Sequence, residues 1–64
     1  MNYQIFTRRA GTGERPRRRD VVDSIEAARA ACANGNASRT RKQVRERYFW
    51  EFANAEWFNQ AWPK

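Results

Sequence analysis

The residues of this chain best suited to chemistry are its arginines, which gather in two blocks. Eleven of the 13 basic residues are arginine, and the net charge is +6. Residues 1–19 carry a net +5 and residues 39–47 a net +4, whereas residues 20–38 and 48–64 are net acidic. Because a guanidinium presents a planar fork of donors, arginine suits phosphates and base edges. The two blocks therefore favour nucleic acid as a partner, with DNA favoured over RNA.

The predicted contacts divide between a basic arm and the start of a helix. Cations are unfavourable at a helix N-terminus, by about 0.3–1 kcal/mol each at exposed sites, yet Arg39, Arg41 and Lys42 fall in the first turns of the second predicted helix. Departure from a local rule often marks a functional site, and DNA-recognition helices present their N-terminal residues to the groove. The predicted nucleic-acid-binding residues are Arg15, Arg17, Arg18, Arg19, Arg39, Arg41, Lys42 and Arg45. The alternative is a solvated face with pairs such as Lys42–Glu46.

The ten residues Arg39–Tyr48, RTRKQVRERY, resemble the third, DNA-reading helix of Myb/SANT repeats, which often reads RT-x-x-Q-V/C-R-x-R-W/Y. The resemblance implies a helix that presents the cations of this string to DNA. The rest of the chain departs from the family, because no tryptophan precedes Trp50 and the segment before Arg39 is rich in glycine and asparagine. The likeness is compatible with DNA binding and assigns no family.

A second group of residues suited to binding is aromatic. Seven of the nine aromatic residues lie in residues 48–62. On a helix, Trp50 and Trp57 would be two turns apart on the same side, away from the core stripe described below. Tryptophan and arginine are enriched in interface hot spots, so Trp50 and Trp57 are predicted partner-binding residues, with a homodimer through this face as one outcome. The alternative is that a small fold covers both helix faces.

Enzymatic and metal chemistry are not expected. The chain has no histidine, which is the commonest general acid–base residue, and its single cysteine, Cys32, can form neither an internal disulfide nor an all-cysteine zinc site. Gly11-Thr12-Gly13 lacks the Gly-Lys-Ser/Thr ending of a phosphate loop. We therefore predict a non-enzymatic protein without cofactor, with no membrane span and a cytoplasmic location.

The first half of the chain predicts a strand, a loop and a helix. Residues 2–8 alternate as a short strand does, and residues 10–16 contain two glycines and a proline, which favour a loop. Residues 17–22 form either a second strand, completing a hairpin, or part of a mobile basic arm. Asp23 with Glu26 fits a capping box, and the following helix is expected to stop at Asn34-Gly35. Its small inward face is Ile25, Ala28, Ala31 and Cys32.

The second half predicts one long helix over residues 39–61. Thr40 with Gln43 is a second capping box. At 100° per residue a core stripe forms from Val44, Tyr48, Phe52, Ala55, Phe58 and Trp62. A strand over residues 44–52 is the rival interpretation, because YFWEF has high β propensity. A break near Asn54, which would give two shorter helices, is a third.

These elements predict an α+β fold: a short N-terminal strand or β-hairpin packed on two helices, about 24–34 and 39–61. Residues 1–64 would form a single small domain, with residues 9–19 as a basic loop or arm. The favoured function is a small nucleic-acid-binding regulator that uses the basic helix start and the arginine arm. The alternative is a phage-type protein that inhibits a host RNA polymerase or CRISPR complex, a nucleoprotein partner, through arginine and tryptophan contacts.

Overall fold

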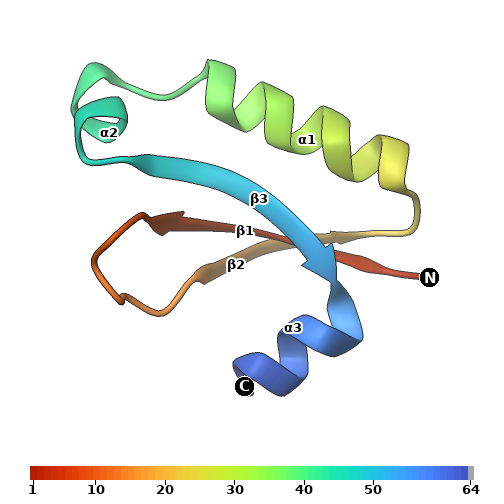
Figure 1. Ribbon diagram of the computed structural model, residues 1–64. Helices are drawn as coiled ribbons and strands as arrows, with labels where there is room; N and C mark the ends of the chain where they lie inside the picture. The colour runs from red at the N-terminus through yellow and green to blue at the C-terminus, as the bar shows by residue number, and fades with distance from the viewer. Residues whose placement is uncertain (64) are drawn as a thin grey trace.

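A three-stranded antiparallel sheet lies at the centre of the structure, a computed structural model that describes residues 1–63. The elements in chain order are β1 (Tyr3–Arg9), β2 (Arg17–Val22), α1 (Ile25–Ala37), α2 (Arg41–Arg45), β3 (Tyr48–Asn54) and α3 (Ala55–Ala61). The strand order is β2-β1-β3. Helix α1 lies along one face of the sheet, and α3 lies beyond the other face (Figure 1). The α+β class is confirmed, and residues 17–22 are the returning strand of a hairpin.

Alternate side chains of β1 point to opposite faces of the sheet, toward α3 on one face and toward α1 on the other. Phe6 packs on Phe58 of α3, with ring centroids 4.7 Å apart. Its neighbour Thr7 points to the opposite face, and its partner in the register of β3 is Trp50, whose ring lies against α1 at Gly35. The buried apolar side chains are Ile5, Phe6, Ala28, Cys32 and Phe58. Burial of Ala28, Cys32 and Phe58 agrees with the faces predicted for them.

The long helix predicted over residues 39–61 is wrong. The capping box of Thr40 and Gln43 forms as expected, but α2 ends at Arg45. Arg47 then adopts the left-handed region, with φ 58°, which turns the chain into β3. All seven residues of β3 pair with β1, so tertiary pairing and the β propensity of YFWEF override the helical stripe. Val44, which the stripe placed in the core, is 51% exposed.

Helix α1 also differs from its prediction at both ends. Its N-cap is Ser24 rather than Asp23, because the Ser24 hydroxyl accepts a hydrogen bond from the amide of Ala27 at 3.1 Å. The helix continues through Asn34-Gly35 to Ala37. A β-carbon at Gly35 would lie 2.3–2.6 Å from three atoms of the Trp50 ring. Glycine is therefore required here by close packing inside the helix, and it is not a stop signal.

The end of α1 also closes the outer edge of β3. The side-chain amide of Asn36 donates to the carbonyl of Trp50 at 3.2 Å, and its oxygen accepts from the amide of Trp50 at 2.8 Å. These two bonds imitate a neighbouring strand at the middle of an edge that would otherwise be open. They fix Trp50 in place, and the outer edge of β2 is left as the other edge of the sheet.

Gly35→Ala is expected to destabilise the fold, although alanine is the better helix former. The propensity gain is about 1 kcal/mol, but the added methyl meets a rigid indole at 2.3 Å, and overpacking of this kind costs about 1–3 kcal/mol or more. Chemical denaturation should therefore show a net loss of about 1–2 kcal/mol. Asn34→Ala, on the preceding exposed position of the same helix, is the control and should be neutral or stabilising. A Gly35→Ala variant as stable as the wild type contradicts the packing described here.

Candidate nucleic-acid interface

Two adjoining hollows lie on the face of the sheet that α1 covers. The arginine hollow, of about 310 Å³, is lined by Thr7, Arg9, Glu14, Arg15, Arg17, Arg19, Gln43 and Tyr48. The tryptophan hollow, of about 480 Å³, is lined by Arg19, Ala31, Asn34, Gly35, Ser38, Gln43, Tyr48 and Trp50. Both volumes fall in the range of ligand sites, about 300–1,000 Å³. Arg19, Gln43 and Tyr48 line both hollows and so form the wall between them.

Arg19 holds the central position in this wall. Ile5 pairs with Asp20 and Phe6 with Arg18, so Arg19 is the extra residue of a β-bulge. Its Nε donates to Thr7 Oγ1 at 3.1 Å and its Nη2 to the Tyr48 hydroxyl at 2.5 Å. Its Cζ lies 5.4 Å from the centroid of the Trp50 ring. Two of the five guanidinium donors are engaged in this way, and the remaining three are available to an anion.

The charge of the arginine hollow is strongly positive. Four guanidinium groups line it with one carboxylate, Glu14. Arg9 is largely compensated, since its Nη1 lies 3.4 Å from Glu14 Oε1 and its Nε 3.5 Å from Glu46 Oε2. Arg15 donates a hydrogen bond to the carbonyl of Pro63, which uses one of its donors, and no carboxylate side chain among residues 1–63 forms an ion pair with it. Arg15, Arg17 and Arg19 are therefore the cations that this hollow offers to a ligand.

The electrostatics of the wall act on Tyr48. Burial raises the pKa of its hydroxyl, but hydrogen bonds with Thr7 and Arg19 and the positive charges of Arg19 and Arg17 outweigh burial. The pKa of Tyr48 is therefore lower than its ordinary value of 10.0. Because the folded-state pKa is depressed, the stability this ionisation contributes is complete above the unfolded pKa and is lost as the pH falls through the folded pKa.

A titration followed by near-ultraviolet absorbance should show Tyr48 forming its phenolate below pH 10. Tyr48→Phe should remove this phase. Arg19→Gln should move the phase to higher pH, because it removes both a donor and a positive charge beside the hydroxyl. A Tyr48 phase at or above pH 10 in the wild type is incompatible with the Arg19–Tyr48 contact.

The structure separates the four predicted arm residues. Arg15 lies in the loop, whereas Arg17, Arg18 and Arg19 belong to β2 and are not part of an arm. Arg18 points to the opposite face, where its Nη2 donates to Asn59 Oδ1 at 2.8 Å and to the carbonyl of Trp62 at 2.6 Å. Its Cζ lies 4.9 Å from the centroid of the Phe58 ring. Arg18 therefore anchors α3 to the sheet and lies outside the two hollows.

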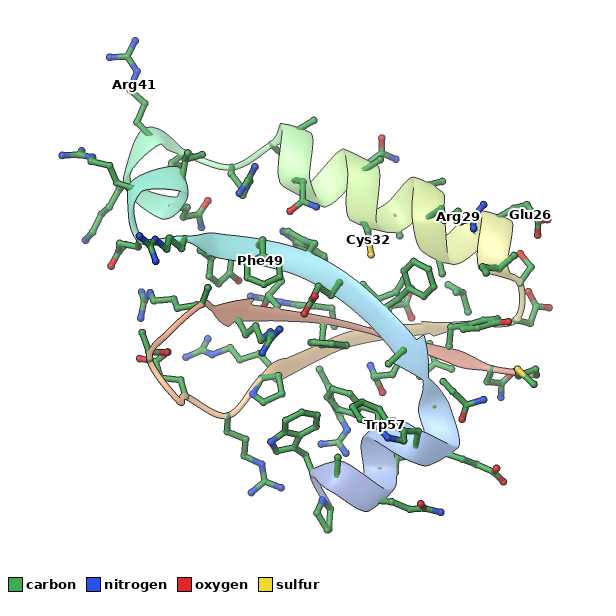
Figure 2. The ribbon with its side chains drawn as sticks, in the orientation of Figure 1. Glu26, Arg29, Cys32, Arg41, Phe49 and Trp57 are labelled. Carbon is green, nitrogen blue, oxygen red and sulfur yellow. The ribbon has the colours of Figure 1, made fainter. Side chains whose placement is uncertain are left out.

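The four predicted helix cations also divide. Arg39 connects α1 to β3, since its Nε donates to the carbonyl of Asn36 at 3.0 Å and its Nη1 to that of Tyr48 at 3.1 Å. Arg41, Lys42 and Arg45 are exposed on α2, and Arg41 extends away from the helix into solvent (Figure 2). The expected crowding of cations at a helix N-terminus is not found, because α2 has only five residues and Lys42 and Arg45 lie in its last turn, where positive charge is favourable. Arg39, Arg41 and Arg45 line a separate hollow of about 600 Å³ together with Val44, and α2 reaches the arginine and tryptophan hollows through Gln43.

Trp50 and Trp57 do not share a face. Trp50 lies on β3 against Gly35, whereas Trp57 lies on α3, on the other side of the sheet (Figure 2). The prediction of a common face fails because the intervening residues change from strand to helix at Asn54–Ala55. Trp57 is 54% exposed and its ring meets Trp62 edge-on, with centroids 5.9 Å apart. The structure therefore offers no combined Trp50/Trp57 face through which a homodimer could form.

Sequence reasoning missed Thr7, Gln43, Tyr48 and Asn34 as lining residues. Gln43 lies within the second basic block and Tyr48 directly follows it, so their positions could have indicated a role in binding. The sequence patterns instead predicted a capping residue and a core aromatic. Gln43 has both roles, because its Oε1 accepts from the amide of Thr40 at 2.9 Å while its side chain lines both hollows. Thr7 and Asn34 carried no signal, since only the packing of α1 on the sheet brings them to this surface.

The remaining chemical groups of the described chain add no second site. Cys32 is buried and points from α1 toward the sheet (Figure 2), and burial together with the Glu51 carboxylate raises the pKa of its thiol. Among residues 1–63, no group of three His, Cys, Asp or Glu side chains is placed to hold a metal ion. Within the same residues, no helix has the length and apolar character needed to cross a membrane.

No family model, curated protein or solved structure matches this chain.

Proposed function

We propose that this protein is a non-enzymatic nucleic-acid-binding regulator whose contact surface is the pair of hollows that runs from the β1–β2 hairpin past Gln43 of α2 to the end of α1. The observation that carries the proposal is the composition of the arginine hollow, whose lining includes four guanidinium groups and a single carboxylate. Arg19 is held there by Thr7 and Tyr48 before any ligand arrives. A fixed guanidinium loses little side-chain freedom on binding a phosphate, and its fork matches the phosphate oxygens.

The proposed surface replaces the basic helix start that the sequence favoured. Arg41, Lys42 and Arg45 would act as a secondary, exposed source of positive charge that attracts the polyanion and contributes little to its placement. Arg15, Arg17 and Arg19 would contact phosphates directly. All six side chains are exposed, so this division rests on hydrogen bonding: the side chain of Arg19 is positioned by Thr7 and Tyr48, whereas that of Arg41 extends into solvent.

A salt series tests the proposal. Binding of a labelled oligonucleotide, followed by fluorescence anisotropy, should weaken with salt because each neutralised phosphate releases counterions. Three phosphates on Arg15, Arg17 and Arg19 predict a slope of log K against log salt of about −2 for a single strand and about −2.7 for a duplex. No binding of either form at low salt contradicts the proposed function.

Protein binding is a second candidate, favoured by one observation. Trp57 is 54% exposed and lies beside Trp62 on α3, and exposed tryptophans are typical of interface hot spots. In this case α3 would contact the protein component of a host nucleoprotein complex. The two hollows, on the opposite face of the sheet, would contact its nucleic acid. Capture from a lysate with and without nuclease separates the candidates. Capture that survives nuclease and is lost with Trp57→Ala but not with Arg17→Gln supports a protein partner, whereas capture that nuclease abolishes and that Arg17→Gln weakens supports nucleic acid.

A further inference from the structure

The two hollows differ in chemistry although they share a wall. The arginine hollow is lined by charged groups, whereas Arg19 is the only charged residue of the tryptophan hollow. The other groups that line the tryptophan hollow are the indole of Trp50, the side chains of Asn34, Ser38, Gln43 and Tyr48, and small residues of α1. A phosphate suits the first hollow. A planar, uncharged, hydrogen-bonding group suits the second.

We infer that the ligand is single-stranded nucleic acid, with a phosphate in the arginine hollow and the base of an adjoining nucleotide in the tryptophan hollow. This inference rests on the proposed function and specifies its ligand. Adjacent charged and uncharged hollows match the alternation of phosphate and base in an unpaired strand. Unpaired bases can leave the stack and contact aromatic rings and guanidinium planes, and the tryptophan hollow is lined by one of each, the Trp50 ring and the Arg19 guanidinium.

Hydrogen-bonding groups are also available for a base edge. The oxygen of the Gln43 amide is occupied by the amide of Thr40, so its NH₂ group is the part that can donate to a ligand. Tyr48 accepts a hydrogen bond from Arg19, and its phenolic hydroxyl has a proton of its own to donate. Groups of this kind read the edges of splayed bases.

A duplex does not offer its bases in this way. Its bases are stacked and paired, and extruding one costs a few kcal/mol unless the site compensates for the lost stacking. The tryptophan hollow would remain empty against a duplex, and only the arginines would be engaged. The structure therefore predicts that a strand with a base free to enter the tryptophan hollow binds more tightly than a strand of equal charge without that base. It also binds more tightly than the duplex, although the duplex carries more charge.

Competition anisotropy with three DNA probes of about 12 nucleotides, within the site sizes known for single-strand binding domains, tests this inference. The probes are a mixed-sequence strand, its duplex, and a strand of the same length whose central nucleotides are abasic. We expect the intact strand to bind about tenfold more tightly than the abasic strand, as one stacked base provides, and more tightly than the duplex.

The outcomes separate the inference from the function on which it depends. Equal affinity for the intact and abasic strands, or tighter binding of the duplex, overturns the inference while the salt-dependent binding of the proposed function stands. Failure of all three probes to bind at low salt overturns both. No substitution is needed, so a folding defect cannot produce either result.

Discussion

The Arg17→Gln/Arg19→Gln variant, which removes two guanidinium groups, is expected to bind nucleic acid more weakly than the wild type, by about 100-fold or more. Hydrogen bonds to charged groups contribute about 1.5–3 kcal/mol, and each 1.4 kcal/mol is a factor of ten in affinity. Arg17 has an exposed side chain beside the hollow, and Arg19 is fixed by two hydrogen bonds within it. The same change should reduce the salt slope by up to about 2 for a duplex. Anisotropy titrations at several salt concentrations give both quantities.

The Arg41→Gln/Arg45→Gln variant is the matched control. It removes the same two charges from exposed positions on α2, so the general attraction of a polyanion falls equally in both variants. Because Arg19 contacts Thr7 and Tyr48, near-ultraviolet circular dichroism must first show that the Arg17/Arg19 variant keeps its fold. A larger loss of affinity in the α2 variant than in the Arg17/Arg19 variant contradicts the assignment of the hollows as the binding surface.

Phe58→Ala is expected to lower the free energy of unfolding by about 3–5 kcal/mol. Phe58 is fully buried; it packs on Phe6 at 4.7 Å and on Trp62 at 5.2 Å, and it lies under the guanidinium of Arg18. Total stability for a chain of this size is about 3–10 kcal/mol, so the variant should be partly or wholly unfolded at room temperature. Urea denaturation followed by circular dichroism measures the change.

Trp57→Ala, one position earlier on α3, provides the control for Phe58. Trp57 is half exposed, and its ring packs edge-on against the ring of Trp62. The loss should therefore be small, about 1 kcal/mol or less beyond ordinary surface effects. If Phe58→Ala is no more damaging than Trp57→Ala, then α3 does not pack on the sheet as described.

Elements fixed by local chemistry were predictable from the sequence, and elements fixed by pairing were not. The alanine-rich stretch of α1, the capping box at Thr40 and the alternation of β1 depend on neighbouring residues and were anticipated. Residues 48–54 satisfy a helical stripe and a β pattern equally, and only seven residues of pairing with β1 decide between them. The continuation of α1 past Gly35 depends on the Trp50 ring, which is likewise a distant contact.

The candidate site was predicted in its residue types and not in its assembly. Arg15, Arg17 and Arg19 were among the predicted contacts, and Trp50 was predicted to bind a partner. Their juxtaposition depends on the bulge at Arg19, on β3 being a strand, and on the end of α1 covering Trp50. Arg18 and Arg39 carry the same charge but are occupied with structural hydrogen bonds. Composition alone cannot distinguish these two from the residues that line a hollow.

Backbone and indole chemical-shift mapping by NMR, with a single-stranded oligonucleotide titrated into the labelled protein at low salt, tests the central claim most directly. We expect the largest chemical-shift changes at Arg17, Arg19, Tyr48 and the Trp50 indole. The indole chemical shifts of Trp57 and Trp62, on the opposite face, should not change. Changes concentrated on α2 or α3, or no changes at all, would contradict the claim that nucleic acid binds in the hollows between β2 and α1.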